Sequence, residues 1–274
     1  MSASPLLYES HMHTTLCRHA VGDLEEYAEV AIARGLKGMT VTCHCPLPNG
    51  LSEHVRMREH EWPEYVELIE VCRKKYKGRL DVRLGIESDY LPGLEPYLEE
   101  LHQREPLSHV LGSVHPHIGE YKDLYLNEND WPAFHRQYYI SLAEAAATGL
   151  FDTLSHPDLV KNQEPSLYDL GELLPHICEC LDRIADTGVA MELNTSGKNK
   201  SVPEMNPAPE ILREARKRDI PFVLGADAHE PGRVADDYPK ALGLLLEAGY
   251  DQVRYFVDRE PIDVQIADAL ESLR

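Results

Sequence analysis

Histidines are numerous in this 274-residue chain, fourteen in all, and several stand two positions from another possible metal ligand. His11 and His13 form one such pair, and Asp227 and His229 form a second. Side chains two residues apart in an extended chain face the same way, so each pair can present two ligand atoms to one point. Neutral imidazoles and carboxylates together bind zinc, iron or manganese, whereas magnesium and calcium prefer oxygen ligands. The spacing therefore predicts a transition-metal site.

Other candidate ligands stand at the ends of apolar, β-branched segments that are typical of buried strands. The predicted strands cover 6–10, 38–43, 80–86, 108–114, 152–155, 189–193 and 222–226, with a weaker candidate at 253–257. The polar residues at their ends include His44, Glu87, His115, His156 and Asn194. One histidine in such a place is usually a hydrogen-bonding or surface residue, but agreement among so many strand ends favours a metal site. The imidazoles exceed what one tetrahedral ion can use, which implies more than one ion.

Amphipathic segments separate these strands, as expected where helices connect parallel strands by right-handed crossovers. The predicted helices cover 22–34, 61–77, 92–104, 131–148, 166–187, 207–218, 235–248 and 261–273. Seven or eight such units favour an α/β fold of the barrel type, in which the carboxyl ends of the strands build the active site. No linker or change in composition divides the chain, so we expect one domain over 1–274.

The chain is strongly acidic, with 27 Lys and Arg against 47 Asp and Glu and a formal net charge of −20. Proteins that follow a nucleic-acid backbone normally carry the opposite sign, so no nucleic-acid partner is expected. No apolar segment reaches the roughly 18 residues of a membrane-spanning helix, and the N-terminus does not resemble a signal peptide. We therefore expect no membrane partner and a cytoplasmic location. The six cysteines include no CxxC pair, and Cys43 and Cys45 are expected to be packing residues.

Motifs of several other active sites are missing from the sequence. It contains no GxSxG, GxGxxG or HExxH pattern. Because no protein nucleophile is evident, we expect water activated by metal ions to attack the substrate.

In their order along the chain, these motifs resemble the PHP (polymerase and histidinol phosphatase) family, and within it the monofunctional histidinol-phosphatase branch. The matching segments are 11–13 with His19, 42–44, 85–90, 112–115, 155–159, 192–197 and 225–229. The resemblance implies a distorted (β/α)7 TIM-like barrel with two or three divalent zinc, manganese or iron ions. It implies one ion on His11, His13, Glu87 and Asp227, and a second on His19, His44 and His229. Glu87 would bridge to a third ion held by His115 and His156.

The resemblance also implies hydrolysis of L-histidinol phosphate to L-histidinol and phosphate, a step of histidine biosynthesis. Asp227 or His229 would orient the attacking hydroxide, and His117 would protonate the leaving group. Contacts to this small phosphorylated substrate are expected from residues on the rim segments, namely Arg18, Lys161, Asn194, Lys198 and Arg233. The oligomeric state is left open.

Three alternatives remain at this point. The first is a PHP phosphoesterase that acts on another small phosphomonoester or a nucleotide. The second is an amidohydrolase-type barrel, which also begins with HxH and ends with Asp but does not account for Glu87, His44 and His229 together. The third is a metal-binding module without turnover.

Overall fold

The computed structural model describes residues 4–274 and contains one sheet of nine strands that follow each other in chain order. Strands β1 to β8 are parallel to their neighbours, and β9 is antiparallel to β8. The strands are β1 (Tyr8–Glu9), β2 (Gly38–Val41), β3 (Asp81–Asp89), β4 (His109–Ser113), β5 (Thr153–Leu154), β6 (Ala190–Asn194), β7 (Phe222–Gly225), β8 (Gln252–Val257) and β9 (Glu260–Gln265). The predicted parallel α/β arrangement is confirmed.

The first and seventh strands meet just beyond their carboxyl ends. Met12 pairs with Ala228 in parallel orientation, with the His13 amide donating to the Ala228 carbonyl at 2.9 Å. Nearer the amino ends, β8 approaches β1, where Tyr8 stacks on Tyr255 with ring centroids 4.7 Å apart. The bridge between residues 12 and 228 therefore brings the first and seventh strands together on the side that carries the predicted ligands, whereas on the opposite side β8 contacts both β7 and β1.

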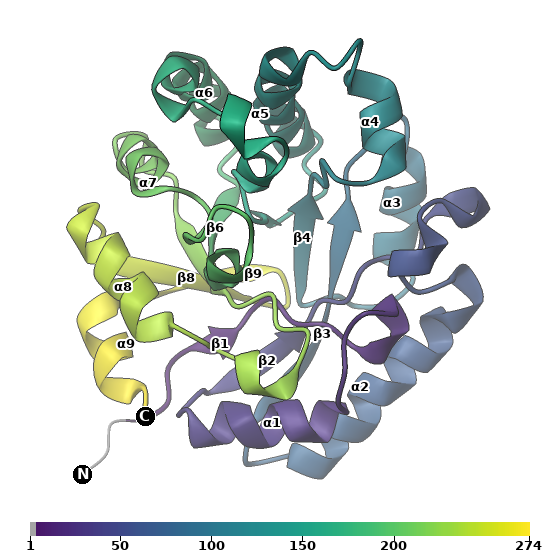
Figure 1. The fold of residues 1–274 in the computed structure, drawn as a ribbon. Helices are drawn as coiled ribbons and strands as arrows, with labels where there is room; N and C mark the ends of the chain where they lie inside the picture. Colours follow the sequence, from purple (N-terminus) through teal and green to yellow (C-terminus); the bar gives the residue numbers. More distant parts are fainter. Residues whose placement is uncertain (1–3) are drawn as a thin grey trace.

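Helices surround the strands in an outer layer (Figure 1). They are α1 (Leu24–Ala33), α2 (Trp62–Tyr76), α3 (Glu95–Gln103), α4 (Gly119–Tyr125), α5 (Trp131–Ala147), α6 (Leu170–Ala185), α7 (Pro209–Arg216), α8 (Tyr238–Glu247) and α9 (Ile266–Ser272). Their starts follow local chemistry: Asp23 caps α1 through the amides of Glu25 and Glu26, and α7 begins with Pro209 in its first turn. None of the helices between residues 4 and 274 is both long and apolar enough to cross a bilayer.

The end of the chain differs from the prediction of a single helix over 261–273. Residues 260–265 form β9, and only 266–272 are helical. Asp258 and Arg259 both have positive φ, which matches the two-residue turns that join the strands of a hairpin. Ile262 and Val264 are partly buried while their neighbours are exposed, an alternation of period two that favours a strand. The short helix α4 was not predicted.

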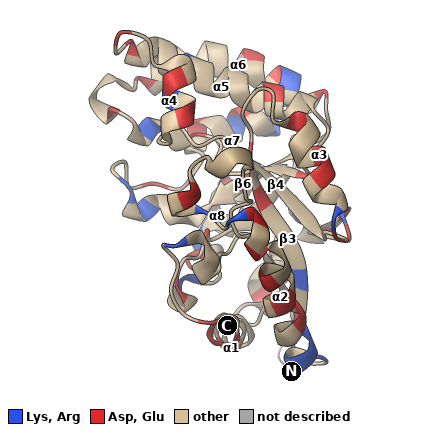
Figure 2. Cartoon of the chain, turned by 90° about the vertical axis from the view of Figure 1, so that its right-hand side faces the viewer, with Lys and Arg blue, Asp and Glu red and all other residues tan. Residues whose placement is uncertain are grey.

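Acidic side chains are spread over the outer helices, with basic side chains between them (Figure 2). Many of the buried polar side chains lie toward the carboxyl ends of the strands, where Glu9, Glu87 and Glu192 are completely buried. Buried carboxylates are costly unless they are paired, so their partners define the site.

Candidate metal centre

The centre of the site is the carboxylate of Glu87, which lies in β3 and is fully buried. Five imidazoles from four other strand ends face its two oxygen atoms. Oε2 lies 3.4 Å from His11 Nε2, 3.6 Å from His13 Nε2 and 2.7 Å from His44 Nδ1. Oε1 lies 3.4 Å from His115 Nε2 and 3.1 Å from His156 Nε2. One carboxylate therefore lies between two groups of nitrogen ligands.

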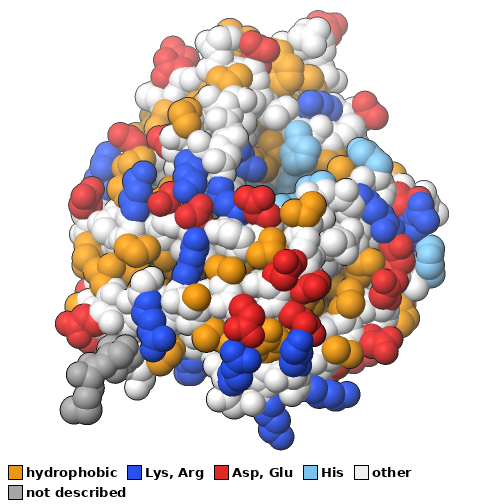
Figure 3. All heavy atoms as spheres, turned by 60° about the horizontal axis from the view of Figure 1, so that its bottom comes forward, with side chains coloured by type: hydrophobic (Ala, Val, Ile, Leu, Met, Phe, Trp, Pro, Cys, Tyr) orange, Lys and Arg blue, Asp and Glu red, His pale blue; other side chains and the backbone are white. Residues whose placement is uncertain are grey.

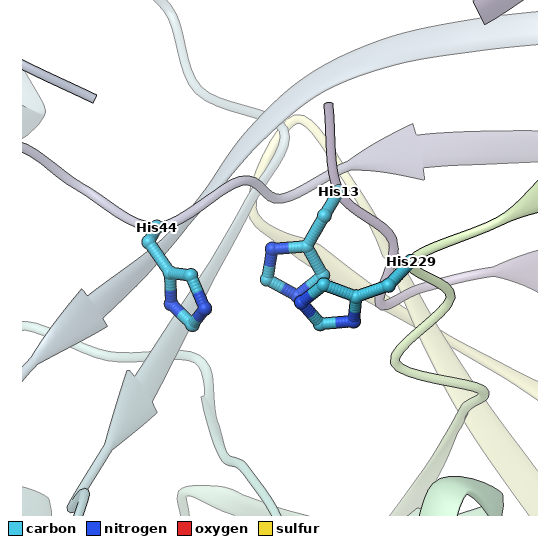
Figure 4. Close-up of side chains that lie close together, drawn as sticks. All are labelled: His13, His44 and His229. Carbon is cyan, nitrogen blue, oxygen red and sulfur yellow. The ribbon is translucent and has the colours of Figure 1, made fainter. Parts of the chain in front are cut away.

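Asp227, just beyond β7, forms the second acidic point of the site. Its Oδ1 lies 3.1 Å from His13 Nε2, 3.6 Å from His11 Nε2 and 3.4 Å from His229 Nδ1. His229 Nε2 in turn lies 2.9 Å from His19 Nε2. Figure 4 shows the rings of His13 and His229 stacked, with a centroid distance of 3.9 Å, and His44 facing them across a gap. The structure thus brings together all nine predicted ligands.

The donor set fits divalent metal ions. His11, His13 and Asp227 offer ligand atoms within 4.8 Å of one another, as do His13, His44 and His229. His44, Glu87 and His115 form a further group of this kind. His11 Nε2 and Glu87 Oε2 are buried without a hydrogen-bond partner among the described residues. Cations placed between these atoms would satisfy lone pairs that the protein itself leaves unmatched.

The imidazoles and carboxylates of the cluster shift one another's pKa values. Burial alone would raise the pKa of Glu87, but the facing imidazoles of His44, His11 and His115 hold it well below its usual range. Burial would lower the pKa of His11, but the carboxylates of Glu192 and Glu87 raise it well above its ordinary value. The carboxylates therefore stay ionised and attract positive charge, which metal ions can supply in place of protons.

Two further carboxylates orient the ligand rings from behind. Glu192, in β6, accepts a hydrogen bond from His11 Nδ1 at 2.7 Å and another from the His156 amide at 2.7 Å. Asp89, at the end of β3, accepts from His115 Nδ1 at 3.0 Å. A bond at Nδ1 leaves Nε2 of the same ring free for a metal ion and fixes its direction. Both carboxylates stand at predicted strand ends, but the sequence did not assign them partners.

Asp89 is itself paired with an arginine from the long segment between β2 and α2. Arg56 donates through Nη1 and Nη2 to the two oxygens of Asp89 at 3.1 and 2.7 Å, and both side chains are buried. Arg56 also donates to the Cys45 carbonyl at 3.2 Å. Nothing in its sequence context identified Arg56, because it belongs to an irregular segment without a motif.

Glu9, in β1, joins segments from the two ends of the chain. Its Oε1 accepts from the amides of His11 at 3.0 Å and Ala226 at 2.9 Å. Its Oε2 accepts from the Ala235 amide at 2.6 Å, and the Tyr238 hydroxyl donates to Oε1 at 3.0 Å. Burial nevertheless raises the pKa of Glu9 to about 6. This carboxylate holds the HxH segment against the segment that carries Asp227.

A cavity of about 680 Å³ opens above the cluster, and Figure 3 shows histidine side chains gathered at a hollow in the surface. His19, His44, Glu87, His115, His156, Asp227 and His229 all line it. The cationic side chains on its wall are Arg56, Lys200 and Arg233. His117 also lines the cavity, on its exposed side, with its ring centroid 5.3 Å from that of His115.

The expected substrate contacts divide into two groups. Arg233 lines the cavity. Lys161, by contrast, is buried, and its Nζ donates to Asp158, Glu204 and the Met205 carbonyl. It is not part of the cavity wall, so its position does not agree with a substrate contact. Its three partners lie on segments 158–161 and 204–205, which it ties together.

The other three expected contacts also have partners away from the cavity wall. Lys198 pairs with Asp236 at 2.8 Å and with Asp237 at 2.7 Å, and Arg18 pairs with Glu61. Asn194 is buried and donates from Nδ2 to Glu192 Oε2 at 3.0 Å. Asn194 therefore supports the carboxylate that orients His11. None of these three residues is among those that line the cavity.

Comparison with known proteins agrees with this geometry. The family model of the PHP domain matches residues 9–196. A probable histidinol-phosphatase of Deinococcus radiodurans is 38% identical over 256 residues, which are 89% of this chain and 94% of the relative. The histidinol-phosphatase of Bacillus subtilis is 28% identical over 259 residues, 84% of this chain and 96% of the relative.

The fold has a solved counterpart as well. The crystal structure of histidinol phosphate phosphatase from Lactococcus lactis, in complex with zinc, L-histidinol and phosphate, superposes with a TM-score of 0.78. Its sequence is 19% identical, and the match covers 93% of this chain and 98% of that one. Because the family model covers more than half of the residues and includes most of the ligand-bearing strand ends, the chain belongs to the PHP domain family.

Proposed function

We propose that this chain is a histidinol-phosphatase that hydrolyses the phosphomonoester of L-histidinol phosphate with bound divalent transition-metal ions. The observation that carries the proposal is the convergence of five imidazoles on Glu87 at the floor of a cavity with cationic side chains on its wall. The curated relatives that match nearly their whole length are histidinol-phosphatases by name. The Lactococcus enzyme binds zinc, L-histidinol and phosphate, which are the metal and the two products of this reaction.

We assign three ions to the cluster. One would be held by His11, His13, Glu87 and Asp227; a second by His19, His44 and His229; and a third by Glu87, His115 and His156. The central carboxylate of Glu87 supports this assignment because its two oxygens face different groups of nitrogens. When bound, such ions act as Lewis acids toward phosphate oxygens and lower the pKa of water.

The phosphate group would be bound by the cations of the cavity wall. Arg233 Nη2 is buried without a hydrogen-bond partner among residues 4–274, and its Nε lies 3.2 Å from Asp236. A guanidinium with free donors binds phosphate oxygens with good geometry. Lys200 lines the same cavity and adds a second positive charge. These two residues replace Lys161, Lys198 and Arg18 in the proposed substrate contacts.

Proton transfer requires groups on both sides of the scissile bond. Asp227 would orient the attacking water; this role is supported by its position on the cavity floor and by the Ser196 hydroxyl, which donates to it at 3.1 Å. His117 lies on the exposed side of the cavity, where it would face the departing alkoxide of L-histidinol. Burial and the neighbouring His115 lower the pKa of His117 to about 3, so it would act there as a neutral imidazole that donates a hydrogen bond. Glu230, also on the wall, offers a carboxylate for the ammonium group of the substrate.

Steady-state kinetics would test this proposal. The protein loaded with Mn²⁺ or Zn²⁺ is assayed on L-histidinol phosphate, p-nitrophenyl phosphate and a nucleoside monophosphate. We expect a kcat/KM for L-histidinol phosphate at least roughly a hundredfold above that for the aryl ester, since a site built for the amine and imidazole discriminates against substrates without them. Lys200→Met should raise KM, and Lys198→Met, a neighbouring lysine outside the cavity, should not.

Two results would contradict the proposal. Equal kcat/KM values for all phosphomonoesters, or preference for the nucleotide, would favour a broader PHP phosphoesterase. A fully metallated protein without turnover on any of the three would favour a non-catalytic metal-binding module. An oligonucleotide serves as a further negative control, because a net charge of −20 is expected to repel polyanions.

We also propose that the protein works in the cytoplasm. All six cysteines are free, and five of them are buried. Free thiols are typical of reducing compartments.

A further inference from the structure

The ligand imidazoles differ in the contacts that their Nδ1 atoms make. His11 and His115 each direct Nδ1 to a buried carboxylate. His19 and His229 direct Nδ1 to backbone carbonyls, at 2.7 and 3.0 Å. His13 is different: its Nε2 faces Asp227 at 3.1 Å, while its fully buried Nδ1 has no hydrogen-bond partner among residues 4–274. His156 Nδ1 is also unpartnered, but it has no thiols grouped with it.

Two cysteine thiols lie beside the ring of His13. Cys17 ends a short 3-10 helix (Thr15–Cys17), Cys43 follows β2, and both are fully buried. The ligand atoms of His13, Cys17 and Cys43 all lie within 4.8 Å of one another. The Cys43 sulfur accepts hydrogen bonds from the Thr14 amide at 3.5 Å and the Thr14 hydroxyl at 3.3 Å. The Cys43 thiol in turn donates to the Thr14 carbonyl at 3.7 Å, and these contacts hold the sulfur in place.

We propose that Cys17, Cys43 and Nδ1 of His13 form a binding site for one thiophilic metal ion, such as Cd²⁺, Cu⁺ or Zn²⁺. Two sulfurs and one imidazole nitrogen are the ligands that soft ions select, and they differ from the carboxylate-rich hydrolytic cluster. The site lies directly behind that cluster and shares His13 with it. The ring would then bind one ion through each nitrogen, as an imidazolate.

Binding of the ion releases the two thiol protons and the Nδ1 proton of His13 to solvent, and three bonds to the metal form. No oxidant or reductant is involved. The sequence indicated a plain packing role for Cys43, but packing alone does not require two sulfurs to be grouped with a buried ring nitrogen that has no other polar neighbour among residues 4–274.

A second group of candidate ligands also includes Cys17. Cys17, His19 and His229 also have ligand atoms within 4.8 Å of one another. An ion there would need only one sulfur and would not involve Cys43. The number of sulfur ligands therefore separates the two sites.

Cadmium titration of the Mn²⁺-loaded protein tests the proposal, with the ultraviolet S-to-Cd²⁺ charge-transfer absorption as the readout. We expect one equivalent of Cd²⁺ to give the absorption of two thiolates, with release of protons to a weakly buffered solution. Cys17→Ser and Cys43→Ser should each reduce the band by half or more and weaken Cd²⁺ binding at least tenfold. Cys72→Ser, which removes a buried thiol in α2 outside the groups of candidate ligands, should change neither.

Three outcomes would overturn the proposal. They are absence of a thiolate band in the parent protein, an unchanged band in Cys43→Ser, and loss of the band in Cys72→Ser. Circular dichroism confirms that each variant is folded. If a serine variant is unfolded, Cys43→Ala is used instead, and protection of Cys17 and Cys43 from alkylation by bound Cd²⁺ in the parent protein decides the question. These readouts do not depend on phosphatase activity, so their failure leaves the proposed function intact.

Discussion

Two arginine–aspartate pairs in this protein each make two hydrogen bonds of similar length but have very different surroundings. Arg56 and Asp89 form a two-point contact at 3.1 and 2.7 Å behind the metal centre, where both side chains are buried. Arg254 and Asp263 form a two-point contact at 2.7 and 2.9 Å across the β8–β9 hairpin, where the side chains are 21% and 38% exposed. The first pair belongs to a network that ends on Glu87, and the second has water on one side.

The difference shows what burial does to an ion pair. Exposed pairs contribute about 0–1 kcal/mol because water and salt screen them. Breaking a buried pair costs about 3–5 kcal/mol because one charge is left without a partner. Burial alone would raise the pKa of Asp89, yet Arg56 and His115 hold it well below its usual range. A buried pair is therefore expected to matter for function, whereas the hairpin pair is a local stabiliser.

The largest effect is expected at the centre of the buried network. Glu87→Gln keeps the shape of the side chain but removes the negative charge that faces five imidazoles. We expect loss of at least one metal equivalent by elemental analysis and loss of nearly all phosphatase activity. His156→Ala should also remove one equivalent and most activity. Full metal content in both variants would contradict the ligand assignment.

Arg56→Met tests the buried pair itself. It removes the guanidinium partner of the buried Asp89 and leaves only His115 Nδ1, at 3.0 Å, facing that carboxylate. We therefore expect the free energy of unfolding to fall by about 3–5 kcal/mol in urea titrations. The double variant Arg56→Met with Asp89→Asn removes both charges and should recover part of that loss. A single variant as stable as the parent would show that the buried pair contributes no more to stability than the exposed pair.

Glu192→Gln tests orientation of a ligand without changing any ligand. The glutamine retains one acceptor oxygen but cannot satisfy both His11 Nδ1 and the His156 amide as a carboxylate does. Loss of such an outer partner typically costs about 10–100-fold in metal affinity or activity. Competition with a chelator measures the affinity. Glu179→Gln, on the exposed side of α6, is the matched control and should leave it unchanged.

The metal-free protein should show a pH dependence to which His115 contributes. Burial lowers its pKa, but Asp89 and Glu87 raise it to about 9. A folded-state pKa above the unfolded value stabilises the fold fully below about pH 6.5. This contribution is lost as the pH rises through about 9. Thermal unfolding after chelation should therefore show decreasing stability over this range, with a smaller decrease in Asp89→Asn and in the metal-loaded protein.

The smallest effect is expected on the hairpin. Arg254→Ala should reduce the free energy of unfolding by about 0.2–1 kcal/mol, and high salt should remove most of the difference. Activity and metal content should stay at the level of the parent. A loss above about 2 kcal/mol would mean that exposure does not separate the two pairs.

The spacing of the candidate ligands predicted which side chains would lie together, because this spacing reflects local chain geometry. His11 and His13, like Asp227 and His229, stand two residues apart at strand ends, and parallel strands bring such ends together. The alternation of strands and helices predicted the parallel sheet for the same reason. The β8–β9 hairpin was missed because 261–273 contains apolar residues that fit either a helix or a short strand followed by a helix.

The residues behind the ligands could not be predicted in this way. Arg56 reaches Asp89 from a segment of irregular backbone, and its partner is 33 residues away in sequence. The lysines of the rim were equally ambiguous. Lys161 and Lys200 each follow one of the segments that match the family. Only the packing of the folded chain directs Lys161 toward the buried Asp158 and leaves Lys200 on the cavity wall. Such contacts depend on tertiary structure rather than on local pattern.

The hydrogen bonds of Glu9 affect when the site can form during synthesis of the chain. Its carboxylate accepts hydrogen bonds from groups 217 and 226 residues further along the chain. A ribosome releases those partners only after it has made residues 226 and 235, so an emerging N-terminal portion exposes His11 and His13 without Asp227 or His229. Stable uptake of the ion that we assign to His11, His13, Glu87 and Asp227 would then follow the emergence of both segments, and metal content would report whether the two segments have come together.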